Sequence, residues 1–220
     1  ISQELKSRGL ASEFKAGYRV SSREVVSVVK EVLCGVMQEQ ILSAFSSIGK
    51  KAAGVCGDEG LFQCSKKYLE IDGDRIDLQF VGEIDALDIS QVSKLLVEDV
   101  IPVVSSLGCD ADGNLYNINA DAGAAALAAA LSAEILCLLT DVDGVFANYP
   151  DKESILHSIS EEDLNSLIAK VDTGMIPKLE AAKAALDSGV SKVLIANGNS
   201  GDALKQSLIE NKIVGTMVQQ

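Results

Sequence analysis

The chain has 220 residues, 47% hydrophobic and 23% charged, a composition typical of folded globular proteins that excludes disorder as the main state. This length allows one compact domain or two very small ones. The 19 basic and 32 acidic residues give a net charge of −13, and such a surface repels nucleic-acid phosphates and anionic membranes. We therefore expect neither nucleic acid nor a membrane as a partner.

The first half of the chain carries local signals for both helices and strands. Ser21 and Glu24 have the spacing of a capping box, and the apolar residues that follow recur at helical intervals. The turn signal at 72–74 separates two runs in which polar and apolar residues alternate. These patterns predict, in chain order, helices over 1–10 and 22–46, a strand over 51–56, a hairpin with strands over 67–71 and 75–81, a helix over 90–97 and a strand over 100–105.

In the second half, helices and strands alternate more regularly. The predicted helices cover 121–132, a segment that begins at 160, 175–188 and 202–209, and the predicted strands cover 134–140, 192–196 and 213–218. Strands with apolar centres that alternate with helices predict an α/β fold, in which a mostly parallel sheet is covered on both faces. The apolar stretch 122–139 is interpreted as a buried helix followed by a buried strand rather than as a membrane span.

The cysteines and the single histidine offer no metal site by their spacing. The sequence contains five cysteines, which is an odd number, and no two of them have CxxC spacing. We therefore expect free thiols, as in a reducing cytosol, and a cytoplasmic protein. His157 has no partner in the sequence for a zinc site and is predicted to be a surface or structural residue. The chain opens with Ile1, inside a predicted helix, and we therefore expect further residues upstream.

The first candidate site follows the strand predicted over 134–140. Ligands of open α/β sheets bind beyond the carboxyl ends of the strands, where hydroxyl and carboxylate groups can bind a ribose or a metal–phosphate unit. A glycine in such a segment lets the backbone approach a ligand closely. The alternative is a polar strand end that only terminates the sheet, and the residues alone leave both open. The segment consists of Thr140, Asp141, Val142, Asp143, Gly144 and Val145.

A second candidate precedes the Ala-rich helix. Asn117 and Asn119 point to the same side if this segment is extended, and Asp121 stands where the helix begins. A helix N-terminus favours anions, so a carboxylate or a phosphate could bind here. The alternative is that Asp121 only caps the helix.

Two cations complete the set of candidates. Lys178 lies in the first turns of the helix predicted over 175–188, where the helix dipole does not favour a lysine, and this placement suggests a nearby anionic ligand. Arg19 follows Gly17 in a predicted loop and could bind a carboxylate through two hydrogen bonds. For each of them, the alternative is an ordinary surface cation. The sequence contains neither GxGxxG nor GxxxxGK[ST], which disfavours a Rossmann dehydrogenase and a P-loop NTPase.

Together these segments resemble the amino-acid kinase family, and within it the enzymes that phosphorylate N-acetyl-L-glutamate. The resemblance covers nearly the whole chain in family order. It rests on SEFKAGYRV (12–20), FVGEI (80–84), YNINAD (116–121), LLTDVDGV (138–145), GMIPK (174–178) and GTM (215–217).

The resemblance implies a three-layer α/β/α sandwich with a mostly parallel central sheet. It implies one amino-acid kinase domain over 1–220, in which residues 1–120 bind the acyl amino acid and residues 121–220 bind the nucleotide. The implied reaction is ATP-dependent phosphorylation of the γ-carboxylate of N-acetyl-L-glutamate in arginine biosynthesis, with Mg²⁺. Such a carboxylate is already ionised at neutral pH, so the reaction needs positioning and charge neutralisation rather than a general base.

The resemblance also implies a role for each candidate residue. Arg19, Asn117 and Asn119 would bind the substrate. Lys178 would stabilise the transferring phosphoryl group, and Asp121 would orient the catalytic lysines. The segment 140–145 would contact the nucleotide. Family members are dimers, or hexamers built from dimers, so a homo-oligomer is expected.

The chain departs from the family pattern in two places. The strand with K-x-G-G and the H-G-G-G loop that open the family pattern are absent, and we expect them upstream of Ile1. The segment 196–199 (ANGN) stands where the family has an I-D-G-type run. Two alternatives stay open: a kinase for a related N-modified amino acid such as 2-aminoadipate, and a non-catalytic regulatory relative. Feedback inhibition by arginine also stays open.

Overall fold

A computed structural model describes residues 1–71, 73–172, 174–210 and 212–219. The chain forms two compact units, Ile1–Gly123 and Ala124–Gln220. This division lies close to the one expected between residues 120 and 121, and helix α5 (Ala120–Ala130) crosses it. Each unit combines helices with parallel strand pairs, so the predicted α/β fold class is confirmed.

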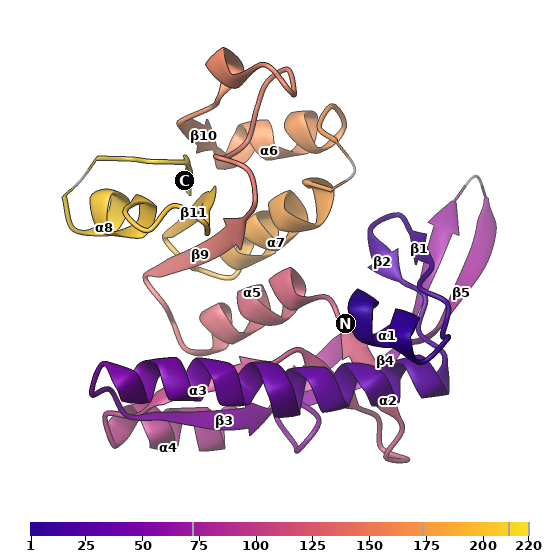
Figure 1. Ribbon diagram of the computed structural model, residues 1–220. Helices are drawn as coiled ribbons and strands as arrows, with labels where there is room; N and C mark the ends of the chain where they lie inside the picture. The colour runs from indigo at the N-terminus through magenta and orange to yellow at the C-terminus, as the bar shows by residue number, and fades with distance from the viewer. Residues whose placement is uncertain (72, 173, 211, 220) are drawn as a thin grey trace. The chain divides into compact units, whose positions relative to one another are not determined.

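The described part of the first unit contains a long helical segment, two two-stranded sheets and a small closed barrel (Figure 1). Its elements are α1 (Ser2–Ser7), β1 (Phe14–Lys15), β2 (Tyr18–Arg19), α2 (Arg23–Lys30), η1 (Glu31–Met37), α3 (Gln38–Ser47), β3 (Ala52–Cys56), β4 (Phe62–Ile71), β5 (Asp74–Leu87), α4 (Ser90–Val97), β6 (Ile101–Ser105), β7 (Leu107–Cys109) and β8 (Leu115–Ile118).

Strands β3 and β6 pair in parallel and lie between α3 and α4 (Figure 1). Gln38 of α3 is buried and its Nε2 donates to the carbonyl oxygen of Val103 in β6 (2.9 Å). Gly54 of β3 makes room for this amide, because a Cβ at Gly54 would lie 2.3 Å from Gln38 Oε1. The helix, the strand pair and the second helix form three layers in this unit.

The helix predicted over 22–46 is confirmed as a continuous segment from Arg23 to Ser47, but its middle part, η1, is a π-helix. Its N-cap is Ser22 and not Ser21, because Ser22 Oγ accepts a hydrogen bond from the backbone N–H of Val25 (3.3 Å). The α2 part buries a valine face against the core. The pattern did not predict the π-helix, whose i→i+5 hydrogen bonds extend over only seven residues within an otherwise α-helical segment.

A disulfide between Cys34 and Cys56 ties the π-helix to the end of β3. Their Cα atoms lie 5.8 Å apart, within the usual range for a disulfide. The expectation of free thiols is therefore wrong for this pair, while Cys64, Cys109 and Cys137 are free. The two residues are 22 positions apart, and only the packing of the helix on the strand brings them together.

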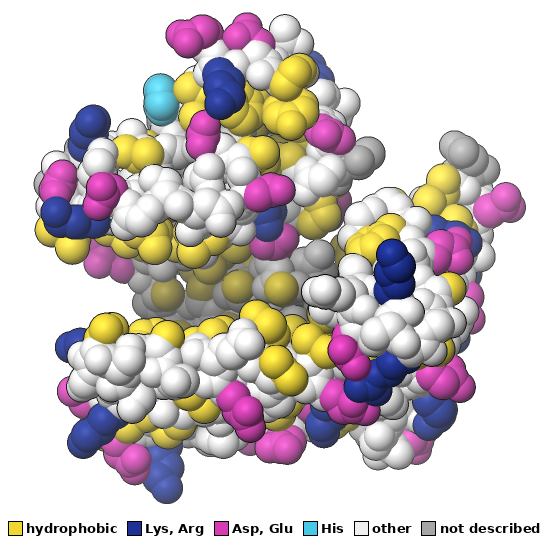
Figure 2. Space-filling view, in the orientation of Figure 1, with side chains coloured by type: hydrophobic (Ala, Val, Ile, Leu, Met, Phe, Trp, Pro, Cys, Tyr) yellow, Lys and Arg dark blue, Asp and Glu magenta, His cyan; other side chains and the backbone are white. Residues whose placement is uncertain are grey.

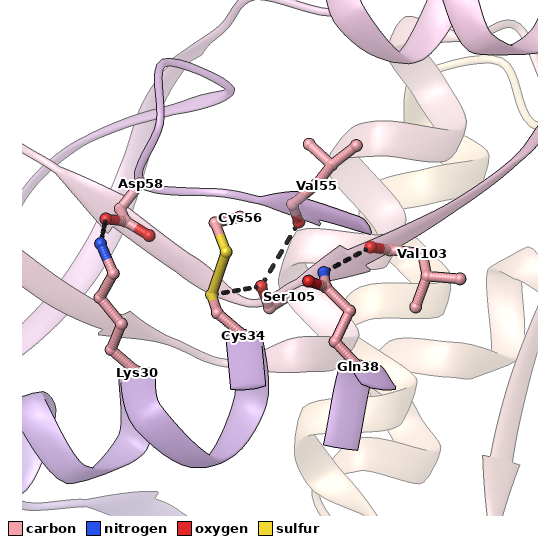
Figure 3. Close-up of a disulfide and its surroundings, with 8 residues drawn as sticks. All are labelled: Lys30, Cys34, Gln38, Val55, Cys56, Asp58, Val103 and Ser105. Carbon is pink, nitrogen blue, oxygen red and sulfur yellow. Dashed lines mark hydrogen bonds and ion pairs between the residues drawn. A yellow bond between two sulfur atoms is a disulfide. The ribbon is translucent and has the colours of Figure 1, made fainter. Parts of the chain in front are cut away.

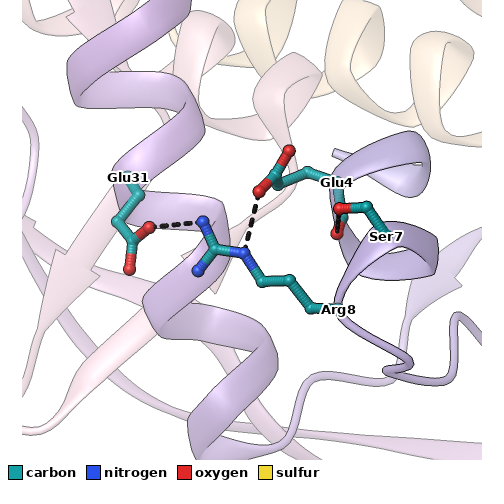
Figure 4. Close-up of polar contacts among 4 residues, drawn as sticks. All are labelled: Glu4, Ser7, Arg8 and Glu31. Atoms are coloured by element: carbon teal, nitrogen blue, oxygen red, sulfur yellow. Dashed lines mark hydrogen bonds and ion pairs between the residues drawn. The ribbon is translucent and has the colours of Figure 1, made fainter.

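Arg8 connects α1 to the long helical segment (Figure 4). Its Nε donates to Glu4 Oε1 (2.8 Å) and its Nη2 to Glu31 Oε2 (2.7 Å). Hydrogen bonds to the two carboxylates raise the pKa of Arg8, and the same contact lowers the pKa of Glu31. Because all three side chains are exposed, water and salt screen this network, and the burial of Leu5 contributes more to holding α1 in place.

Strands β4, β5, β8 and β7 form a small closed barrel. Strands β4 and β5 form the predicted hairpin, but they extend well beyond 67–71 and 75–81. The predicted turn at 72–74 includes residue 72, which lies outside the described residues. Strands β7 and β8 pair antiparallel across residues 110–114 and were not predicted. Gly57 lies against this barrel, because a Cβ there would lie 2.3 Å from the carbonyl oxygen of Leu107.

The second unit has one sheet of order β10-β12-β11-β9. Strand β11 pairs in parallel with β9 and antiparallel with β12, and β12 pairs in parallel with β10. The predicted helices and strands of this half are confirmed within a few residues, apart from β10, which was not predicted. The elements after α5 are β9 (Ile135–Thr140), η2 (Lys152–Ser154), β10 (Ser158–Ser160), α6 (Glu161–Ile168), α7 (Ile176–Asp187), β11 (Lys192–Asn197), α8 (Ala203–Leu208) and β12 (Thr216–Gln219).

The buried residues of β11 alternate between two apolar cores. Val193 and Ile195 pack in the core formed with α5, α6 and α7, while Leu194 and Ala196 pack against the Ala203 side. Successive side chains of a strand point to opposite faces, so this sheet is covered on both faces, as the alternating elements predicted.

The structure also bears on the predictions for His157 and for a membrane span. His157 is a structural residue, since its Nδ1 donates to the carbonyl oxygen of Gly215 (3.1 Å). Within the described parts of the chain, every helix is too short or too polar to cross a lipid bilayer.

Candidate functional site

In the first unit, the completely buried side chain of Ser21 connects the segments that carry Arg19 and Asn117. Its hydroxyl donates to the carbonyl oxygen of Arg19 (3.0 Å) and accepts from Asn117 Nδ2 (3.3 Å). Its backbone joins β5, because its N–H donates to the carbonyl oxygen of Leu78 (3.3 Å) and its own carbonyl accepts from the N–H of Phe80 (2.8 Å). One buried residue therefore fixes Arg19 and Asn117 relative to each other.

The Arg19 guanidinium is held by neutral groups of the first unit. Arg19 lies in β2 of a short hairpin, where the sequence predicted a loop. Its guanidinium carbon lies 4.4 Å from the ring centre of Phe14, and its nitrogens donate to Ser12 Oγ and to Ser2 Oγ (the latter at 3.0 Å). Partial burial lowers the pKa of Arg19. These contacts orient the guanidinium without cancelling its charge, as an anion-binding arginine requires.

Asn117, Asn119 and Asp121 lie at the junction of β8 and α5. Asn117 is opposite Val81 in the parallel pair β5–β8. Asn119 Oδ1 accepts from the N–H of Ala122 (3.0 Å), so Asn119 caps α5. Asp121 lies inside the first turn of α5 and is not the cap that the sequence suggested. A carboxylate in this position is stabilised by the positive end of the helix dipole.

In the second unit, the segment after β9 is held by side chains of two other strands, through one buried and one exposed hydrogen bond. The fully buried Thr216 of β12 accepts from the N–H of Val145 through its Oγ1 (2.8 Å). A Cβ at Gly144 would lie 2.8 Å from the same hydroxyl, so only glycine fits there. Asn197 at the end of β11 donates from Nδ2 to Asp143 Oδ1 (2.8 Å). The predicted segment Thr140–Val145 therefore has a fixed shape.

This segment forms one wall of a cavity of about 230 Å³ within the second unit. Gly174 and Met175, which lead into α7, also line it. A lining that combines a few polar groups with apolar and aromatic ones is typical of small-molecule sites. The lining residues are Thr140, Asp141, Val142, Val145, Phe146, Tyr149, Val171, Asp172, Gly174 and Met175.

Lys178 lies in the first turn of α7, next to this cavity in the sequence. Its backbone N–H donates to the carbonyl oxygen of Met175, a lining residue (3.1 Å). The N-terminus of α7 contributes further positive potential, so a lysine here adds to a field that favours anions. Residue 173, which directly precedes the GMIPK run, lies outside the described residues.

The sequence did not reveal the supporting roles of Ser21, Thr216 and Asn197. Ser21 has the spacing of a helix cap, and its role depends on contacts with β5 and with Asn117, which is 96 positions away. Thr216 supports Val145 from 71 positions away, and Asn197 reaches Asp143 from 54. Only the GTM run at 215–217, which contributes to the family resemblance, drew attention to Thr216.

A family model and curated proteins match nearly the whole chain. The model of the Amino acid kinase family matches residues 1–197. Acetylglutamate kinase from Corynebacterium jeikeium is 40% identical over 219 residues, which are 99% of this chain and 69% of that protein. The enzyme of the same name from Bifidobacterium animalis subsp. lactis is 40% identical over 222 residues, 100% of this chain and 73% of that protein.

Solved structures with the same fold are more distant in sequence. N-acetylglutamate synthase from Neisseria gonorrhoeae, in complex with coenzyme A and N-acetyl-glutamate, superposes with a TM-score of 0.84 at 23% identity, over 98% of this chain. This chain spans about half (48%) of that synthase chain. Carbamate kinase from Giardia lamblia superposes with a TM-score of 0.61 at 17% identity, over 99% of this chain and 79% of that one. The chain therefore belongs to the amino acid kinase family.

The Thr216 hydroxyl offers a test of how the segment 140–145 is held. We expect Thr216→Val to lower the free energy of unfolding by about 1–3 kcal/mol, because the buried N–H of Val145 loses its acceptor while the side-chain shape is kept. Thr216→Ser keeps the hydroxyl and is the matched control. Urea unfolding of both variants measures the difference, and equal stabilities would contradict this role of the hydroxyl.

Proposed function

We propose that this chain transfers the γ-phosphoryl group of ATP to the γ-carboxylate of N-acetyl-L-glutamate, giving N-acetyl-L-glutamyl 5-phosphate in arginine biosynthesis. The relatives named acetylglutamate kinase support this substrate, at about 40% identity over nearly the whole chain. The observation that carries the proposal is the Arg19–Ser21–Asn117 connection, since it presents a guanidinium and a carboxamide from one rigid support.

The substrate end of the reaction is assigned to the first unit. N-acetyl-L-glutamate carries two carboxylates and an amide, and these groups need a cation and neutral hydrogen-bonding groups. Arg19 supplies the charge and the planar donor geometry that carboxylates prefer. Asn117 supplies a carboxamide that can contact the amide or a carboxylate, and Asn119 lies beside it at the start of α5.

The nucleotide end is assigned to the second unit, whose cavity suits the parts of ATP. The accessible aromatic residues Phe146 and Tyr149 can pack against a purine, and Thr140 and Asp141 can hydrogen-bond a ribose. The carboxylates of Asp141 and Asp172 line the same cavity and are oxygen ligands of the kind that Mg²⁺ prefers. When bound, Mg²⁺ would neutralise phosphate charge.

The chain's own residues then have separate tasks. The γ-carboxylate attacks as an ionised group, so no residue has to remove a proton from it. Lys178 balances the charge on the phosphoryl group as it transfers, which is the main form of catalysis in phosphoryl transfer. Asp121 acts as a positioning residue that orients the lysines. Asn197 and Thr216 act indirectly, because they hold the backbone of the segment 140–145.

A related N-modified amino acid is the alternative substrate, since Arg19 and Asn117 suit any N-acylated amino dicarboxylate. The test is an assay of ADP release by the native protein with N-acetyl-L-glutamate and N-acetyl-2-aminoadipate in competition. We expect N-acetyl-L-glutamate to have the higher kcat/KM. A preference for the longer substrate would support the alternative, and the absence of ADP release with either would contradict both.

Replacement of Arg19 tests the substrate site. We expect Arg19→Lys to raise KM for N-acetyl-L-glutamate about 10–100-fold, because a lysine keeps the charge but loses the fork of N–H donors. The KM for ATP should stay unchanged, and it serves as the internal control. Steady-state kinetics with each substrate varied in turn measures both values. An increase in KM for ATP alone would contradict the assignment.

Replacement of Lys178 tests the catalytic role. We expect Lys178→Ala to lower kcat about 100–1000-fold, the usual effect of removing one group that stabilises a transition state. Lys183, five positions later in α7, pairs with Asp187 and provides a matched control as Lys183→Ala. Circular dichroism verifies that both variants are folded. Near-normal turnover of Lys178→Ala would overturn this role.

We also propose that the protein is a homo-oligomer that associates through its long helical segment. Figure 2 shows hydrophobic side chains gathered along this segment, and Val36, Met37 and Ile41 are 55%, 42% and 41% exposed. Exposed apolar groups on neighbouring turns are typical of interfaces. We expect Ile41→Asp to lower the mass measured by sedimentation to that of a smaller species, while Glu39→Asp leaves it unchanged. An unchanged mass of Ile41→Asp would contradict this interface.

A further inference from the structure

Cys34, Cys56 and Asp58 form a compact cluster in the first unit, away from Arg19 and Asn117 in the sequence (Figure 3). Cys34 lies in the π-helix η1, Cys56 ends β3, and Asp58 lies in the turn that follows. The two sulfurs and a carboxylate oxygen of Asp58 all lie within 4.8 Å of one another. Two cysteines and one carboxylate in such proximity are a ligand set for a thiophilic metal ion.

The carboxylate of Asp58 supplies a second and independent observation. Its side chain is only 9% exposed. Its Oδ2 accepts from Lys30 Nζ (2.5 Å), while its Oδ1 is buried and has no hydrogen-bond partner. Buried polar atoms nearly always have a partner, so an unpaired carboxylate oxygen beside two sulfurs indicates that something else binds there. Lys30 holds the carboxylate in place and leaves this oxygen directed to the cluster (Figure 3).

The neighbouring groups fit a bound cation in number and in charge. The Ser105 hydroxyl lies 3.0 Å from Cys34 Sγ and 3.4 Å from the carbonyl oxygen of Val55, so its oxygen is a nearby fourth donor atom. Two thiolates and the Asp58 carboxylate carry three negative charges. A divalent cation and the Lys30 ammonium carry three positive ones, so the occupied site is neutral.

We propose that Cys34, Cys56 and Asp58 bind a thiophilic divalent cation such as Zn²⁺ when the Cys34–Cys56 disulfide is reduced. A dithiol reductant gives two electrons and two protons to the disulfide and is itself oxidised to a disulfide. The cation then displaces the two thiol protons and bonds to both sulfurs and to Asp58. The disulfide and the metal complex are therefore alternative states of the same two sulfurs.

The cysteine spacing could not reveal this site. Zinc ligands usually come in pairs separated by two to four residues, whereas these cysteines are 22 positions apart. The site does not depend on the proposed kinase activity, because none of its residues belongs to the proposed substrate or nucleotide site.

Titration of the protein with Co²⁺ and Zn²⁺ tests the proposal. The native protein is reduced with a phosphine, freed of metal and titrated with Co²⁺ under argon. We expect one equivalent to bind with the near-ultraviolet absorption of a sulfur-to-cobalt bond, and one equivalent of Zn²⁺ to remove that absorption. The same protein, oxidised so that mass spectrometry detects the Cys34–Cys56 bond, should lose this absorption, and this comparison needs no variant.

Two variants and a control assign the ligands. The double variant Cys34→Ser/Cys56→Ser should abolish the sulfur-to-cobalt absorption, and Asp58→Asn should weaken Co²⁺ binding at least tenfold. Cys137→Ser, in β9 of the second unit, should leave binding unchanged. Absence of the absorption in the reduced protein would overturn the proposal, and so would its persistence in the double variant or in the oxidised protein. Should the double variant fail to fold, the comparison of reduced and oxidised protein decides.

Discussion

The hydrogen bonds of the buried Ser21 hydroxyl are the interaction on which the proposed substrate site depends. A hydroxyl that is completely removed from water has to donate and accept within the protein, and here its partners are the carbonyl of Arg19 and the amide of Asn117. Because the backbone of Ser21 is also bonded to β5, neither partner can shift without leaving a buried polar group unpaired. A long arginine side chain is flexible by nature, and this support, with Phe14 and the serines around it, restricts its guanidinium.

In the second unit, a buried hydroxyl likewise supports the proposed nucleotide site. Thr216, also completely buried, holds the backbone at Val145, and Asn197 holds Asp143. In both units a polar group from a distant strand fixes a segment that follows a strand end. Preorganised donors and cations of this kind lower the barrier of phosphoryl transfer without any reorganisation during the reaction. In the proposed function, the first unit recognises the substrate and the second stabilises charge at the phosphates.

Local sequence signals predicted most elements but not the contacts that build the sites. Ser160 with Asp163 predicted the start of α6, and the structure confirms this cap at 3.3 Å. The three- and four-residue strands β7 and β8 were missed because pairing with the barrel, rather than their own sequence, stabilises them. The Cys34–Cys56 pair was not predicted either, because only the packing of the helix on the strand brings the two cysteines together. The motif residues Arg19, Asn117 and Thr140–Val145 could be selected from the family resemblance, whereas Ser21 and Thr216 required the structure.

In the proposed reaction, a carboxylate of N-acetyl-L-glutamate receives the phosphoryl group. An acyl phosphate reacts with hydroxylamine to give a hydroxamate, whereas other phosphorylated products do not. The decisive measurement is the amount of hydroxamate and of ADP formed when the native protein is incubated with N-acetyl-L-glutamate, ATP, Mg²⁺ and hydroxylamine. If this reaction takes place, hydroxamate and ADP form in equal amounts and only when N-acetyl-L-glutamate is present. Formation of ADP without hydroxamate, or of neither product, would contradict it.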